Sequence, residues 1–142
     1  MASFYDKKKK CRVGTMDEAQ FYAECDAANG AYFRRLLAAW EKAGGTLKWG
    51  AGGVGLRGTI KGKEVGICFV APAFAGKKDR IELGCAALTK QIGESNCESL
   101  TKLLRKAAGD SVAGASMISL IQPGDLPKSA QEAVTKAFLT ML

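Results

Sequence analysis

The chain has 142 residues, of which 47% are hydrophobic and 25% are charged, and its formal net charge is +7. This length fits one domain with a core of its own, and this composition excludes an intrinsically disordered chain. The sequence holds no histidine, which excludes Ser-His-Asp and Cys-His catalytic sites, HExxH metalloproteases and histidine-ligated haem or iron.

The first residues are strongly basic. Residues 1–12 carry five basic side chains and one acidic one, and four of the basic ones form the run Lys7–Lys10. Because like charges repel, we expect residues 1–13 to be a flexible basic arm, followed by a single α+β domain over residues 14–142. The apolar segment of a signal peptide is absent, and no stretch is long enough to span a membrane, so we expect a cytoplasmic protein without a membrane partner.

An apolar stripe at helical spacing predicts a long helix over residues 15–43. Thr15 and Glu18 fit a capping box at its start, and Gly44-Gly45 fits its end. Asn29-Gly30 predicts a kink or a break in the middle, because both residues are poor helix formers. The stripe, which we expect in the core, consists of Phe21, Cys25, Ala28, Tyr32, Leu36 and Trp40.

Residues 46–71 change to the alternating period of strands and predict a β-hairpin. We expect a two-residue turn at Gly62-Lys63, because glycine there tolerates the backbone of a tight turn. This register directs valine, leucine, isoleucine and phenylalanine side chains to one face together. It places Arg57 opposite Cys68 on the other face.

The remainder of the chain predicts a loop at 72–79, then alternating strands and helices. The expected elements are a strand at 80–85 with Ile81 and Leu83 on one side, a short helix at 86–92, a helix beginning at a Ser95–Glu98 capping box, a strand at 116–122 that is covered on both sides or central, and a last helix beginning near 125–129. The order α-β-β-β-α-α-β-α predicts a two-layer α+β sandwich whose mainly antiparallel sheet has about four strands.

The segment Trp49–Gly58 contains five glycines and matches G-x-G-x-x-G twice. A dinucleotide-binding fingerprint needs a helix directly after its glycines, whereas strands are expected here. Trp49 and Val54 also differ in parity, which predicts a bulge or small loop among the glycines between them. Since glycine weakens a strand, either packed neighbours need the space or a ligand lies on a bare patch of sheet.

The ligand interpretation makes the outer sheet face an anion site. Arginine beside glycines suits a carboxylate or phosphate, and a neighbouring cysteine would be a reactive thiol. The candidate ligand-binding residues are Trp49, Gly53, Gly55, Arg57, Cys68, Lys77 and Lys78. Without histidine there is no evident base for Cys68, and the five cysteines have no metal-ligand spacing, so no catalytic residue, metal site or cofactor is predicted.

The placement of charge predicts an anionic partner. Residues 46–80 carry seven basic and two acidic side chains, which adds a second positive segment to the N-terminal one. We therefore expect a non-enzymatic binding domain that engages nucleic acid or an acidic ligand through its basic β-hairpin and N-terminal arm. The alternatives are a homodimeric interaction module, a small-ligand-binding module, and a small enzyme that uses Arg57 and Cys68.

Overall fold

The computed structural model describes residues 2–74, 76–114 and 116–142, so Met1 of the predicted arm and Ala75 of the predicted loop lie outside it. Its strands are β1 (Phe4–Asp6), β2 (Cys11–Val13), β3 (Thr46–Trp49), β4 (Val54–Ile60), β5 (Lys63–Ala71), β6 (Arg80–Gly84), β7 (Val112–Ala113) and β8 (Met117–Ile121). Its helices are α1 (Glu18–Glu24), α2 (Ala27–Lys42), α3 (Cys85–Ile92), α4 (Glu94–Ala108) and α5 (Lys128–Leu139), with short 3-10 turns η1 (Gly109–Ser111) and η2 (Pro123–Asp125).

The main sheet has six antiparallel strands in the order β3-β4-β5-β6-β8-β7. This confirms the predicted mixture of helix and antiparallel strand. The predicted element order is wrong, because β1 and β2 precede the first helix, β3 is a strand of its own, and β7 lies at the far edge. The loop expected after Trp49 is confirmed: Gly50 donates its N–H to the Gly53 oxygen at 2.9 Å, and β3 turns back onto β4.

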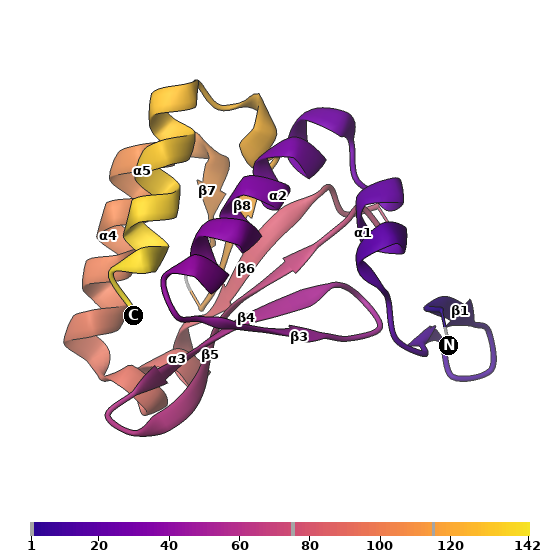
Figure 1. Cartoon of the computed structure of the whole chain (residues 1–142), viewed down its shortest axis with the longest axis horizontal. Helices are drawn as coiled ribbons and strands as arrows, with labels where there is room; N and C mark the ends of the chain where they lie inside the picture. The colour runs from indigo at the N-terminus through magenta and orange to yellow at the C-terminus, as the bar shows by residue number, and fades with distance from the viewer. Residues whose placement is uncertain (1, 75, 115) are drawn as a thin grey trace.

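The N-terminal segment has regular structure that the lysine run did not suggest. β1 and β2 form a separate hairpin beside α1 (Figure 1). Asp6 closes its turn, because the carboxylate accepts the N–H groups of Lys8 and Lys9 at 2.9 and 3.2 Å. This local cap offsets the repulsion on which the expectation of an unstructured segment rested. The division into an arm and a domain at residue 13 stays a prediction.

The helix predicted over 15–43 is two helices, and they separate at Cys25-Asp26 rather than at Asn29-Gly30. The first is capped by Asp17, whose carboxylate accepts the Gln20 N–H at 2.7 Å, so the predicted Thr15–Glu18 box is wrong. The box at Ser95 is wrong as well, because α4 begins at Glu94 and has no side-chain cap.

A buried polar network explains where α2 begins. The Asp79 carboxylate is 2% exposed and accepts the backbone N–H groups of Asp26 at 2.7 Å and Ala73 at 2.6 Å. It also accepts from the side-chain amide of Asn29 at 3.0 Å, and the oxygen of that amide accepts the Gly124 N–H at 2.7 Å. The network ties the start of α2 to the β5–β6 loop and to the segment before α5, and it holds Asn29 inside a continuous helix.

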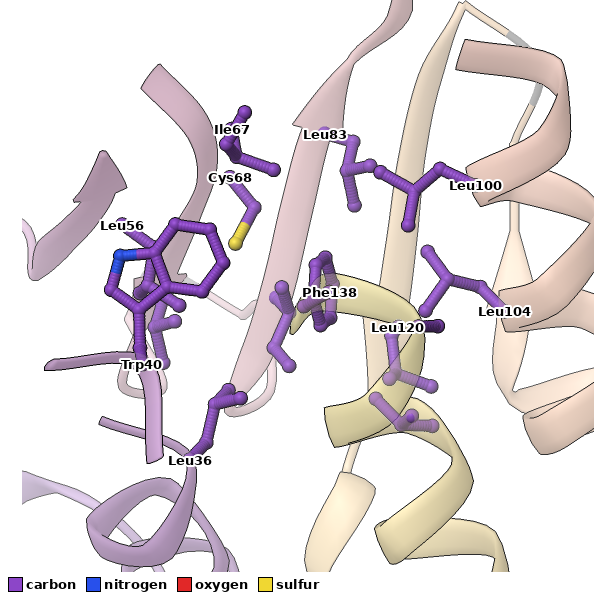
Figure 2. Close-up of a cluster of buried hydrophobic side chains, with 14 of the residues drawn as sticks. Leu36, Trp40, Leu56, Ile67, Cys68, Leu83, Leu100, Leu104, Leu120 and Phe138 are labelled. Atoms are coloured by element: carbon purple, nitrogen blue, oxygen red, sulfur yellow. The ribbon is translucent and has the colours of Figure 1, made fainter. Parts of the chain in front are cut away.

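The hydrophobic core lies between one face of the sheet and the helices α2, α4 and α5. Figure 2 shows Trp40 beside Leu56 of β4, with Phe138 of α5 at the centre of the cluster. Ile81 and Leu83 point into this core, which confirms the predicted inward side of β6. We call this the inner face of the sheet and the opposite one the outer face.

The strand predicted at 116–122 is β8, and it is not covered on both sides. It lies between β6 and the short edge strand β7, and Ile118 and Leu120 are buried on the inner face. Met117, on the outer face, is 50% exposed. None of the helices in the described part of the chain is long and apolar enough to cross a membrane.

Candidate functional site

The β4–β5 hairpin has a different turn and register from those predicted. Its two central turn residues are Lys61 and Gly62, both with positive φ (52° and 79°), as in the tight turns that match strand twist. Arg57 consequently pairs with Gly66. The register then shifts between Arg57 and Leu56, and Leu56 pairs with Cys68, so Ile67 is the extra residue of a β-bulge.

The bulge reverses the faces of the following residues. Cys68 points into the core, where it is 8% exposed, and burial raises the pKa of its thiol. Phe69, predicted to point inward, pairs with Gly55 and Glu82 at outer-face positions. The predicted pairing of Arg57 with Cys68 is therefore wrong, and a reactive thiol beside the arginine is not formed.

A groove of about 530 Å³ lies on the outer face, between the sheet and α3. Its lining includes three glycines from three strands, Gly55, Gly66 and Gly84, with Phe69 on β5 between Gly55 and β6, and the buried Leu88 of α3. The other lining residues are Lys48, Trp49, Gly50, Arg57, Glu64, Val65, Ile67, Cys68, Glu82, Ala87 and Gln91. We refer to this feature as the outer groove.

The glycines near the outer groove have different reasons to be glycine. A Cβ on Gly53 would lie 2.1 Å from the Val70 backbone oxygen, so close packing requires glycine there. A Cβ on Gly55 would meet nothing nearer than 3.7 Å, and one on Gly84 nothing nearer than 3.9 Å. Packing explains Gly53, whereas Gly55 and Gly84 leave part of the sheet without side chains.

Two cations stand at the outer groove. Arg57 is 30% exposed and donates from Nε to Glu64 at 3.1 Å. Its Nη1 lies 3.2 Å from the place a Cβ would take on Gly66, so the guanidinium covers that glycine. Among the described residues neither Nη atom has a hydrogen-bond partner, and Lys48 has no ion pair. Both side chains are therefore available to an anion.

The structure brings together only part of the predicted site. Trp49, Gly55, Arg57 and the buried Cys68 line the outer groove, whereas Gly53 belongs to the β3–β4 turn. Lys77 and Lys78 lie in the β5–β6 loop, outside the groove. The prediction missed the contributions of Phe69, Gly84, Ala87, Leu88 and Gln91. Phe69 was hidden by the bulge, and the α3 residues have no sequence signal that relates them to the hairpin.

Within the described ranges, no group of three or more histidine, cysteine, aspartate or glutamate side chains could hold a metal ion. Comparison of the chain with protein-family models, with curated proteins and with solved structures gives no match. The function is therefore inferred from the geometry of this chain.

Proposed function

We propose that this protein is a binding domain that holds a small amphipathic anion in the outer groove. The observation that carries the proposal is a pair of glycines in the outer groove that packing does not require, Gly55 and Gly84, together with the cations Arg57 and Lys48. In this arrangement α2, α4 and α5 cover the inner face of the sheet, and the ligand occupies the outer face beside α3. The sequence predicts either nucleic acid or an acidic ligand as the partner, and we assign the acidic ligand to this groove.

The anionic group of the ligand is assigned to Arg57. An arginine with two unengaged Nη groups presents the geometry that binds a carboxylate, sulfonate or phosphate in a bidentate way. Lys48 is on the neighbouring strand, opposite Gly55, and is thus a diagonal neighbour of Arg57 within reach of the same anion. Glu64 holds the guanidinium from one side through Nε, which orients it without occupying its outer edge.

The apolar body of the ligand is assigned to the glycine-lined part of the outer groove. Gly55 and Gly84 expose flat backbone, and the partly exposed ring of Phe69 and the exposed Ala87 of α3 add apolar surface beside them. A volume of about 530 Å³ lies in the range of small-molecule sites, which are mostly apolar with a few placed polar groups. A flat, mainly hydrocarbon acid fits this surface better than a sugar or a polyphosphate.

Binding is tested with two fluorescent probes that differ only in one anionic sulfonate group: anilinonaphthalene sulfonate and the uncharged phenylnaphthylamine. We expect the sulfonate to bind more tightly, because it gains the Arg57 contact, and we expect Arg57→Gln to remove most of that advantage. Arg105→Gln on α4 is the matched control, since Arg105 donates to the Gly114 oxygen away from the groove. Equal affinity for both probes in the unmodified protein would refute the proposal.

A second copy of the chain is the competing occupant of the outer face. It would bury Phe69 and Met117 together, since both are at outer-face positions. Sedimentation velocity at increasing protein concentration distinguishes the two. A monomer that binds the sulfonate supports the small-ligand proposal, whereas a dimer that excludes the probe would replace it with the homodimeric alternative.

A further inference from the structure

A second surface, separate from the outer groove, combines aromatic rings with an arginine and exposed lysines. Tyr5 of the N-terminal hairpin lies against Phe74 of the β5–β6 loop, with ring centroids 5.8 Å apart. The guanidinium of Arg12 lies 5.0 Å from the centroid of the same Phe74 ring. Tyr5 and Arg12 are paired across the hairpin and both lie against Phe74; we call these three side chains the stack. Tyr5 is 48% exposed, so part of its ring is open to solvent.

The hairpin that carries Tyr5 is held firmly in place. Arg12 makes a bidentate ion pair with Glu24 of α1, at 2.8 and 3.0 Å. Ser3 donates its N–H to the Gln20 side chain at 3.0 Å and accepts back from that side chain at 2.8 Å. The Phe74 side is fixed as well, because Phe74 and Lys77 exchange two backbone hydrogen bonds at 3.0 Å each. The stack is thus ordered before any partner arrives.

The two segments that form this stack also carry exposed lysines. The hairpin turn supplies Lys7–Lys10, and the same loop as Phe74 supplies Lys77 and Lys78. Among the acidic groups of these two segments, Asp6 is engaged by the backbone of the turn, and Asp79 is buried in its own network. We call the set Tyr5, Lys7–Lys10, Arg12, Phe74, Lys77 and Lys78 the basic corner.

The basic corner does not include the β4–β5 hairpin. The Lys61-Gly62 turn lies at the end of β5 opposite the β5–β6 loop, and a nine-residue strand spans roughly 30 Å. In Figure 1 the N-terminal hairpin lies at one end of the long axis and α3 toward the other. The sequence predicts one anionic partner, nucleic acid or an acidic ligand, bound by the β-hairpin and the arm together; we propose two separate surfaces instead.

We infer that the basic corner binds single-stranded nucleic acid, with a base stacked on Tyr5 and the phosphates on the lysines. Stacking on an exposed ring beside a lysine-lined path is the usual means of binding unpaired strands without sequence preference. A duplex does not offer its base faces to such a ring. An anionic membrane is less suited, because the adjacent Phe4 and Tyr5 point to opposite faces of their strand and cannot insert together.

Phe4 provides a matched control for stacking. It is 49% exposed, next to Tyr5 in the same strand, and directed away from the stack. With a labelled oligothymidylate of about 12 nucleotides, we expect Tyr5→Ser to weaken binding about tenfold, while Tyr5→Phe and Phe4→Ser leave it unchanged. Fluorescence anisotropy gives the affinities, and thermal melts establish that each variant is folded. Equal losses for Tyr5→Ser and Phe4→Ser would overturn the stacking assignment.

The lysines are tested by salt dependence. Binding should weaken as salt rises. Replacing Lys7–Lys10 with glutamine should make this dependence shallower, reducing the magnitude of the slope of log affinity against log salt by up to about 3, because fewer phosphates are neutralised. The double variant Lys61→Gln, Lys63→Gln at the β4–β5 turn should leave the slope unchanged. Binding to phosphatidylserine vesicles without binding to the oligonucleotide would overturn the inference in favour of a membrane. Failure here leaves the groove proposal intact, because the probe tests there involve neither Tyr5 nor these lysines.

Discussion

The indole nitrogen of Trp40 donates a hydrogen bond to the backbone oxygen of Arg57 at 2.9 Å and shares its hydrogen with the Thr46 oxygen at 3.1 Å. Trp40 of α2 is fully buried, and its ring thereby links β3 and β4 on the inner face of the sheet. One of the two backbone oxygens it binds belongs to Arg57, whose side chain lies in the outer groove on the opposite face. The position of the Arg57 guanidinium is consequently set by the core as well as by Glu64.

Two glycines in the same segment should differ in how much stability is lost when each is replaced by alanine. Gly53→Ala forces a Cβ to within 2.1 Å of the Val70 oxygen at a φ of +154°, so we expect a loss of about 2–4 kcal/mol in the free energy of unfolding. Gly55→Ala meets only ordinary contacts, and we expect a change within about 1 kcal/mol. Urea denaturation measures both, and comparable losses at the two positions would contradict the division of the glycines.

The β4–β5 hairpin could be predicted only in part from the sequence pattern. The alternation of Val54, Leu56 and Gly58 correctly predicts which side of β4 is buried. The turn is displaced by one residue because Lys61 adopts a positive φ, which a non-glycine residue does only uncommonly. The bulge at Ile67 then brings Cys68 inward and Phe69 outward, and no feature of the residue pattern marks it.

The break between α1 and α2 could not be read from local signals either. Asn29-Gly30 is the weakest helical dipeptide of the segment, yet it lies inside α2. The helix begins where it does because Asp79 accepts the Asp26 N–H, and those residues are 53 positions apart in the chain. Here a contact between residues far apart in the sequence overrides the local helix propensity of Asn29-Gly30. The outer groove was only partly predictable for the same reason, since α3 reaches it through the fold.

The cysteines should differ sharply in alkylation of the native protein. Cys11 is exposed, whereas Cys68 and Cys97 are buried, and burial raises the pKa of Cys25 to about 12. At pH 8 we expect iodoacetamide to modify Cys11 first, and Cys68 only after unfolding in urea. Peptide mass spectrometry over time measures each site. Rapid modification of Cys68 in folded protein would place it on the outer face, against the bulged register.

Attachment of the N-terminal hairpin should depend on pH. The hydrogen bonds from Arg12 lower the pKa of the Glu24 carboxyl below its ordinary value of 4.5. Because the folded pKa is the lower one, the stabilisation from this pair is complete above pH 4.5 and is lost as the pH falls through the folded value. The ring-proton chemical shifts of Tyr5 should follow this loss, since Tyr5 packs on Phe74 only when the hairpin is attached.

Two variants of α1 test whether Glu24 is the group that causes this pH dependence. Glu24→Gln should shift the Tyr5 resonances toward their acid positions already at neutral pH, because the ion pair with Arg12 is gone. Glu18→Gln, on the same helix, should leave the titration unchanged, because Arg12 binds Glu24 rather than Glu18. A Tyr5 titration that persists in Glu24→Gln would show that another group controls attachment.

The most direct measurement compares two leucine substitutions on the outer side of β4. Gly55→Leu places a side chain in the lining of the outer groove, and Thr59→Leu places the same side chain on the same face, outside it. Titration with anilinonaphthalene sulfonate should show at least about tenfold weaker binding for Gly55→Leu and unchanged binding for Thr59→Leu. If Gly55→Leu remains folded and binds the probe as well as the unmodified protein does, the outer groove is not the ligand site.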